Sequence, residues 1–206
     1  DCNSFYASVE CLHHPEIREK PVAVGGDIEQ RHGIILAKNQ LAKQFHVSTG
    51  EAIWQAKQKC PELIVLPPDF PLYLRFSRLA RDIYLDYSSR VEPFGLDEAW
   101  MDITSRENQK DKGELGITVS IGVSYNKIFA KLGSDYRKPD AVTLITKENY
   151  RQTAWPLPVS DLLYVGPATK RKLNGFGVHT IGELAQTPVE ILRSKFGKIG
   201  DIVVCS

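Results

Sequence analysis

The chain is poor in cysteine and methionine, and it contains no long apolar run. Its 206 residues include four cysteines and one methionine. The cysteines show no CxxC spacing, which argues against a zinc site or a disulfide framework, so we expect reduced thiols in a cytoplasmic protein. The apolar runs are far shorter than the roughly 20 residues needed to cross a bilayer, and no signal-peptide pattern is visible. What remains is an ordinary globular composition, with 42% hydrophobic and 25% charged residues.

An excess of charge of either sign is also missing. There are 26 basic and 25 acidic residues, for a net charge of +1. The total therefore favours neither a nucleic acid nor any other polyanion as a partner. Basic residues do gather in three stretches, at 127–138, 170–172 and 193–198. Such clusters are typical of solvated helix faces, and they also fit phosphate binding beside an acidic metal site.

The chain does have an acidic tetrapeptide, Gly-Leu-Asp-Glu at 95–98, between two strand-like apolar runs. Neighbouring strand residues point to opposite faces, so Asp97 and Glu98 share one site only if a turn or bulge breaks the pleat. Gly95 permits such a turn. Asp1 offers a third carboxylate. Carboxylates at strand ends suit a pair of Mg²⁺ ions, which can clamp the attacking and leaving oxygens of a phosphoryl transfer.

Hydrophobic periodicity predicts a mixture of helices and strands. Apolar residues three and four positions apart predict helices at 5–11, 38–45, 49–59 (capped by Thr49), 72–87 and 127–132. Short apolar runs between turn residues predict strands at 21–24, 33–37, 63–66, 91–94, 99–104, 117–123 and 142–145. The long helix would bury the stripe formed by Leu72, Phe76, Leu79, Ile83 and Tyr87.

Residues 104–114 are polar and lack an apolar period, although an α/β sheet normally has a crossover helix at this point. We therefore expect residues to be missing between Ile103 and Ile117, with two consecutive Cα atoms farther apart than the usual ~3.8 Å. The start of the chain also looks clipped before Asp1.

Residues 147–161 predict a domain boundary, because they include an extended Trp-Pro-Leu-Pro segment. Beyond it, short helices with capping boxes at Thr180 and Thr187 alternate with glycine-containing turns, which predicts a helix–hairpin–helix unit. Gly166 would direct backbone N–H groups at a DNA phosphate. The alternative is a small helical bundle without a ligand. The cations that would support DNA binding are Lys170, Arg171 and Lys172.

Four segments resemble Y-family, translesion DNA polymerases of the DinB (polymerase IV) branch. Residues 1–10 (DCNSFYASVE) resemble the opening metal motif, and residues 95–99 (GLDEA) resemble the second. Residues 118–139 resemble the strand, helix and Lys-Pro turn that follow, and residues 166–184 resemble the thumb. The segments occur in the family's order and cover nearly the whole chain, so their combination is specific although each alone is weak.

The resemblance implies an α+β right-hand fold. The palm, with a ferredoxin-like sheet, would comprise residues 1–12 and 70–148, and a small α/β fingers insertion would comprise residues 13–69. Residues 149–206 would form a helical helix–hairpin–helix thumb. The family's C-terminal DNA-clamping domain is absent from the sequence, so we expect a catalytic core.

The resemblance also implies a site for two Mg²⁺ ions. Asp1 and Asp97 match metal ligands of the family. Glu98 matches the catalytic carboxylate beside the metal that activates the primer 3′-hydroxyl. The backbone carbonyl of Cys2 matches a ligand of the nucleotide-bound metal.

Three further positions match nucleotide-binding residues. Phe5 and Tyr6 would contact the incoming nucleotide. Tyr6 matches the steric gate, whose ring excludes a 2′-hydroxyl, whereas periodicity alone would make it a core aromatic. Lys138 matches a triphosphate-binding lysine, with a solvated turn lysine as the alternative.

The chain departs from the family at several positions. Many relatives have Asp at the position of Asn3, which is not a matched ligand. The family often has Tyr and Arg where this chain has Gln40 and Lys43, and Lys43 offers a triphosphate only a point charge. Asp102 is interpreted as structural, with a ligand role as the alternative.

The implied activity is DNA-templated DNA polymerisation, which adds deoxynucleotides to a primer 3′-hydroxyl in translesion synthesis and DNA repair. The implied partners are primer–template DNA, a deoxynucleoside triphosphate and a sliding clamp that would bind outside these residues. We expect a monomer without membrane contact, in the cytoplasm and, in a bacterium, at the nucleoid. Two alternatives stay open: a palm-fold nucleotidyl cyclase, and a DNA-binding module without catalysis.

Overall fold

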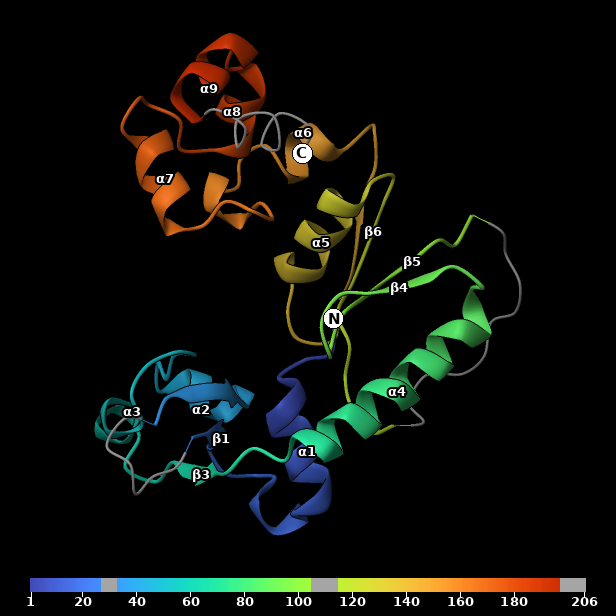
Figure 1. Ribbon diagram of the computed structural model, residues 1–206, viewed down its shortest axis with the longest axis vertical. Helices are drawn as coiled ribbons and strands as arrows, with labels where there is room; N and C mark the ends of the chain where they lie inside the picture. Colours follow the sequence, from blue (N-terminus) through green and yellow to red (C-terminus); the bar gives the residue numbers. More distant parts are fainter. Residues whose placement is uncertain (27–32, 105–114, 197–206) are drawn as a thin grey trace. The chain divides into compact units, whose positions relative to one another are not determined.

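The computed structural model describes residues 1–26, 33–104 and 115–196 (Figure 1). The chain divides into two compact units, Asp1–Val119 and Ser120–Ser206. Their boundary lies inside the range predicted for the palm, and the division into palm, fingers and thumb stays a prediction. The polar segment in which we expected a chain break lies outside the described residues. No helix within these described ranges is long and apolar enough to cross a membrane.

In the first unit, a three-stranded sheet has the order β2–β1–β3. β1 (Val22–Gly25) lies in the centre, antiparallel to β2 (Ile35–Lys38) and parallel to β3 (Ile64–Leu66). All four residues of β1 are buried. The apolar cluster at this sheet includes residues of α2 (Gln40–Gln44) and α3 (Ile53–Lys59), namely Ala42, Ile53 and Ala56.

Both of these helices begin later than predicted. Lys38 belongs to β2, and Asn39 then caps α2, because its side-chain oxygen accepts a hydrogen bond from the Ala42 N–H at 2.9 Å. A β-bridge between Ile34 and Ala52 keeps the chain extended up to Ala52, so the helix predicted from 49 starts at 53. The prediction that Thr49 caps this helix is wrong; the Thr49 hydroxyl instead accepts a hydrogen bond from Lys38 Nζ at 3.0 Å.

α1 (Phe5–His13) and α4 (Phe70–Tyr87) pack against each other. Asp69 caps α4 by accepting a hydrogen bond from the Leu72 N–H at 3.0 Å. The buried residues of α4 are Tyr73, Ser77 and Ala80, so the buried stripe lies one position away from the predicted one, whose member Leu79 is 38% exposed. The physical reason is that Tyr73 finds a buried partner for its hydroxyl on α1.

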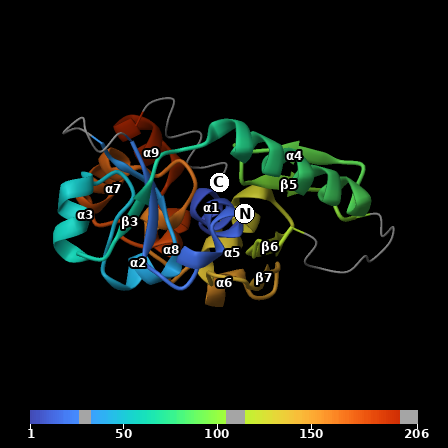
Figure 2. The same cartoon turned by 90° about the horizontal axis from the view of Figure 1, so that it is seen from below.

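A hairpin of β4 (Val91–Pro93) and β5 (Ala99–Met101) runs along α4 in both views (Figures 1 and 2). The two strands are antiparallel, with Val91 opposite Met101 and Pro93 opposite Ala99. The hairpin therefore presents the acidic tetrapeptide, residues 95–98, at its turn.

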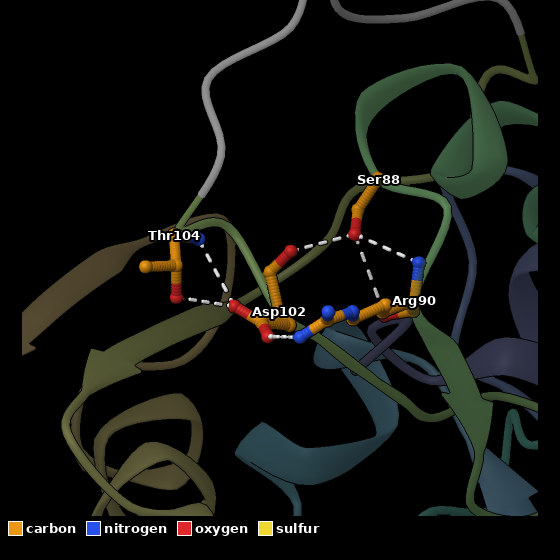
Figure 3. Close-up of polar contacts among 4 residues, drawn as sticks. All are labelled: Ser88, Arg90, Asp102 and Thr104. Atoms are coloured by element: carbon orange, nitrogen blue, oxygen red, sulfur yellow. Dashed lines mark hydrogen bonds and ion pairs between the residues drawn. The ribbon is translucent and has the colours of Figure 1, made fainter.

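Asp102 follows β5, at the end of the hairpin away from this turn. Figure 3 shows its polar contacts. Its carboxylate accepts hydrogen bonds from the Arg90 guanidinium and from the Thr104 N–H, both at 3.0 Å. The Ser88 hydroxyl donates to the Asp102 carbonyl at 2.6 Å. The hydrogen bonds from Thr104 and the charge of Arg90 lower the pKa of Asp102 below its ordinary value. These contacts support the structural interpretation of Asp102.

In the second unit, β6 (Ile121–Ser124) and β7 (Val142–Ile145) form a parallel two-stranded sheet, against which α5 (Lys127–Tyr136) packs. Asn126 caps α5, since its side-chain oxygen accepts a hydrogen bond from the Phe129 N–H at 2.7 Å. The helix continues four residues beyond the predicted end at 132.

Beyond β7 the described part of the second unit, up to residue 196, is mainly helical. The predicted capping box at Thr180 is confirmed: the Glu183 N–H donates to Thr180 Oγ1 at 3.2 Å, and the Thr180 N–H donates to the Glu183 carboxylate at 2.9 Å. The core of this part includes Leu173, Leu184 and Leu192. Its elements are α6 (Tyr150–Thr153), a 3₁₀ turn (Val159–Asp161), α7 (Pro167–Asn174), α8 (Ile181–Gln186) and α9 (Val189–Phe196).

Candidate active site

The acidic turn between β4 and β5 interrupts the alternation of the strands. Gly95 has a φ of +82°, a left-handed conformation that glycine adopts without a steric cost. A hydrogen bond from the Phe94 N–H to the Glu98 carbonyl at 2.9 Å closes the turn. The predicted break in the pleat is therefore present. Because Asp97 and Glu98 lie in a turn, the alternation of a regular strand does not force their side chains to opposite faces.

The start of the chain meets this turn. The Cys2 N–H donates a hydrogen bond to the Asp97 carbonyl at 2.8 Å, and Cys2 also pairs with Val119 in an antiparallel β-bridge. Burial raises the pKa of the Cys2 thiol, and the nearby charges of Asp97 and Glu98 raise it further. Asp1 precedes Cys2, so the structure brings the three predicted carboxylate residues into one neighbourhood.

The donor set suits Mg²⁺, because three carboxylates and the Cys2 carbonyl are all hard oxygen ligands. Within the described residues, however, no three His, Cys, Asp or Glu side chains are grouped closely enough to form a metal cage. Mg²⁺ commonly keeps several waters and binds through one or two carboxylates plus substrate phosphates. An open carboxylate neighbourhood that a nucleotide completes is consistent with that behaviour, and the individual ligand roles stay predictions.

An aromatic cluster fixes Tyr6 beside the acidic turn. The Tyr6 ring stacks on Tyr73, with centroids 4.3 Å apart and an interplanar angle of 11°, and meets Phe70 edge-on at 6.0 Å. Burial raises the pKa of the Tyr6 hydroxyl, and the charge of Asp97 adds to the shift. The Phe5 side chain is only 3% exposed and belongs to the core. Tyr6 is thus a half-buried ring in a fixed orientation near Asp97.

A buried polar pair beneath this cluster was missed by the sequence analysis. The Tyr73 hydroxyl donates a hydrogen bond to Glu10 Oε1 at 2.5 Å, and the two residues are 0% and 5% exposed. Burial and the hydrogen bond to Glu10 raise the pKa of Tyr73 above its ordinary value. The sequence signal for this pair was Glu10 itself, a glutamate on the apolar side of α1. A buried carboxylate needs a hydrogen-bond donor, so its position could have predicted a polar partner.

In the second unit, Lys138 lies just beyond α5 and is held by a carboxylate. Asp135 accepts hydrogen bonds at 2.8 Å from both Lys138 Nζ and Lys131 Nζ. Burial alone would raise the pKa of Asp135, but the two ammonium groups hold it below its ordinary value. The predicted triphosphate-binding lysine is therefore part of a three-residue charge cluster.

The predicted fingers lysine also has a neighbour that the sequence analysis missed. Lys43 lies on α2, and Gln40 is the first residue of that helix. Burial lowers the pKa of Lys38, and the charge of Lys43 lowers it further, so the two ammonium groups act on each other. Lys38, the last residue of β2, is thus a second cation near Lys43.

The predicted DNA-binding residues lie along α7, from its N-cap to its last turn. Gly166 is the N-cap residue of that helix and is exposed. Lys170, Arg171 and Lys172 are exposed on α7, and Lys172 Nζ lies 6.0 Å from the centre of the Phe196 ring. The structure thus keeps the predicted cations available to solvent.

Comparison with known proteins identifies the class to which this fold and site belong. Residues 1–135 match the model of the impB/mucB/samB family. The chain therefore belongs to this family, and the predicted relationship to Y-family DNA polymerases is confirmed.

Its relatives include several named DNA polymerase IV. The DNA polymerase IV of Acetivibrio thermocellus is 54% identical over 213 residues, which cover 97% of this chain and 53% of the relative. DNA polymerase IV 1 of Bacillus subtilis is 42% identical over 209 residues, covering 96% of this chain and 50% of the relative. The chain thus spans about half the length of the curated relatives it matches.

Solved structures agree with this assignment. DinB from Sulfolobus solfataricus matches with a TM-score of 0.84 and 25% identity, over 100% of this chain and 64% of that chain. An insertion ternary complex of Dbh DNA polymerase matches with a TM-score of 0.87 and 24% identity, over the same shares of the two chains. The mixed α/β fold is therefore that of Y-family polymerases.

Proposed function

We propose that this chain is the catalytic core of a translesion DNA polymerase, which adds deoxynucleotides to a primer 3′-hydroxyl on a DNA template. The observation that carries the proposal is the 2.8 Å hydrogen bond from the Cys2 N–H to the Asp97 carbonyl, which joins the opening motif to the acidic turn. Membership of the impB/mucB/samB family and the relatives named DNA polymerase IV support it.

The carboxylates of Asp1, Asp97 and Glu98 and the carbonyl of Cys2 are the groups that would hold two Mg²⁺ ions. When bound, these ions neutralise charge on the reacting phosphates and align the attacking oxygen. The chain's own contribution is the 2.8 Å hydrogen bond from the Cys2 N–H to the Asp97 carbonyl, which keeps the opening segment beside the hairpin turn that carries Asp97 and Glu98. Glu98 is the proposed catalytic carboxylate, beside the metal position that activates the primer 3′-hydroxyl.

Other residues bind and select the nucleotide. Tyr6, which is stacked on Tyr73, acts as the steric gate beneath the incoming sugar. Phe5, the first residue of α1, packs against the Tyr6 ring with centroids 5.8 Å apart and supports it from the core. Lys138 and Lys43 supply positive charge to the triphosphate, as ammonium groups without the bidentate geometry of arginine.

The ferredoxin-like palm comprises residues 1–12 and 70–148, the fingers 13–69 and the helix–hairpin–helix thumb 149–206. The thumb positions primer–template DNA without reading its sequence. Its phosphate contacts come from Gly166 and from the cations on α7, Lys170, Arg171 and Lys172.

Primer extension tests the proposal. With Mg²⁺ and deoxynucleoside triphosphates, the full-length protein should lengthen a primed template, and it should release no cyclic nucleotide from a nucleoside triphosphate alone. Asp97→Asn and Glu98→Gln should lower the rate by at least about 100-fold and keep DNA affinity within about twofold. Cyclic product without DNA would indicate a cyclase, and equal, negligible extension by all three proteins would indicate a silent DNA-binding module.

The steric gate makes a separate prediction. Tyr6→Ala removes the ring that would clash with a 2′-hydroxyl, so the preference for deoxyribonucleotides over ribonucleotides should fall by roughly 10- to 100-fold. Single-nucleotide insertion with each sugar measures the ratio of the two kcat/KM values. A ratio equal to that of the unmodified protein would show that another group excludes the ribose.

A further inference from the structure

The acidic turn is fixed at several of its peptide groups. Cys2 holds the Asp97 carbonyl, and the Phe94 N–H holds the Glu98 carbonyl. The Leu96 side chain packs against the apolar cluster that contains Cys2 and Phe5. None of these contacts involves the peptide groups of Gly95, the residue at the beginning of the turn.

Gly95 is the position of greatest backbone freedom in the turn. It has no side chain, its φ is +82°, and a Cβ placed on it would meet only Asp97 Oδ1, at 3.8 Å. Glycine reaches both halves of φ space about equally, so nothing in its own chemistry keeps this conformation. A rotation at Gly95 would shift Asp97 and Glu98, which follow it after Leu96.

Arg81 supplies the missing restraint. It lies on α4, and its Nη2 donates a hydrogen bond to the Gly95 carbonyl at 2.9 Å. α4 is an 18-residue helix with Tyr73 packed in the core, so the arginine is anchored to a rigid element. A hydrogen bond from a charged donor is stronger than one between neutral groups.

We propose that Arg81 is a positioning residue for the acidic turn: by holding the Gly95 carbonyl, it keeps Asp97 and Glu98 in the orientation that catalysis needs. The inference rests on the proposed polymerase function for its catalytic meaning. Arg81 touches neither nucleotide nor metal in this role. Its effect should therefore fall on kcat and on the order of the turn, with little change in the binding of nucleotide or DNA.

The test compares three variants of the full-length protein. Arg81→Met keeps much of the aliphatic stem but removes the guanidinium, and Arg81→Lys restores a charged donor. Arg78→Met is the matched control, because it removes the same charge from an exposed position three residues earlier on α4. Two readouts are needed: steady-state single-nucleotide insertion, and amide hydrogen–deuterium exchange of the metal-free protein over residues 94–98.

Arg81→Met should lower kcat by roughly 10- to 100-fold, with the KM for nucleotide changed less than about threefold. Exchange should rise in residues 94–98 alone, at an unchanged melting temperature, because the turn opens locally. Arg81→Lys should recover part of both losses, and Arg78→Met should match the unmodified protein.

Two results would overturn the inference. One is Arg81→Met with unchanged kcat and unchanged exchange in the turn. The other is a loss of kcat accompanied by raised exchange throughout the first unit, which would assign Arg81 to general stability. If the unmodified protein fails to extend any primer, the proposed function falls, and the exchange measurement alone then decides whether Arg81 orders the turn.

Discussion

At the scale of a single residue, Tyr73 makes two contacts that matter for the site, one through its hydroxyl and one through its ring. Its hydroxyl satisfies the buried carboxylate of Glu10, and its ring carries the stacked ring of Tyr6. A buried carboxylate without a hydrogen-bond donor is costly, so the pair stabilises the contact between α1 and α4. The same pair holds the proposed steric gate in place.

Tyr73→Phe keeps the ring and removes the hydroxyl. The variant should unfold with a free energy lower by about 1–3 kcal/mol, because the buried Glu10 carboxylate loses its donor. Urea denaturation measures the change, and Tyr164→Phe is the control, since Tyr164 is 61% exposed. Equal losses in the two variants would contradict the role given to Glu10.

Asp135 gives a prediction about pH. Its folded-state pKa is lowered by Lys131 and Lys138 against the effect of burial, so its ion pairs stabilise the protein above the ordinary aspartate pKa. That contribution is lost as the pH falls through the lower, folded-state value. Asp135→Asn should cost about 0.5–1 kcal/mol at neutral pH, since the side chain is 44% exposed, and less at an acidic pH below the ordinary aspartate pKa. A difference that is the same at both pH values would refute the assignment.

At the scale of elements, β6 and α5 approach so closely that only glycine fits between them. A Cβ on Gly122 would lie 1.8 Å from the Ala130 carbonyl oxygen and 2.5 Å from the Ser134 nitrogen. Gly133 faces it from the helix, where a Cβ would lie 3.1 Å from the Gly122 Cα. This contact sets the distance between the sheet and the helix that leads to Lys138.

Gly122→Ala should therefore destabilise the second unit by about 3 kcal/mol or more, because the added methyl group meets backbone atoms that cannot move independently. Gly166→Ala is the control for folding, since a Cβ there has nothing within 4 Å. Thermal unfolding followed by circular dichroism measures both variants. Equal melting temperatures would show that α5 can shift without cost.

At the scale of the whole molecule, the net charge of +1 provides little general attraction for DNA. The proposed binding to primer–template DNA must then depend on local groups, and the cations on α7 are the proposed source. Each phosphate contact adds about 0.9 to the slope of log affinity against log salt concentration.

Replacing Lys170, Arg171 and Lys172 with alanine should weaken DNA binding and reduce this slope by about 2–3. Fluorescence anisotropy at several salt concentrations measures the slope. The matched control replaces three cations of the first unit outside the proposed contact surface, Arg18, Lys20 and Lys57. An unchanged slope in the first variant would remove α7 from the proposed DNA interface.

Much of the local structure could be predicted from the sequence, and the errors have specific causes. The capping box at Thr180 depends on residues within a few positions, so the pattern was sufficient. The start of α3 and the buried stripe of α4 were predicted wrongly, because a bridge between Ile34 and Ala52 and a partner for Tyr73 on α1 decided them. Such contacts leave no local periodic signal.

The sequence by itself determined which chemical groups are present: an acidic turn with a glycine that permits it, an opening aspartate and an aromatic pair, in the order of a polymerase family. Only the tertiary structure decided which groups meet. Cys2 reaches Asp97, Tyr73 reaches Glu10 and Arg81 reaches Gly95. These contacts form when helices and strands bury their apolar faces together, a result of the packing of the whole unit that no single segment encodes.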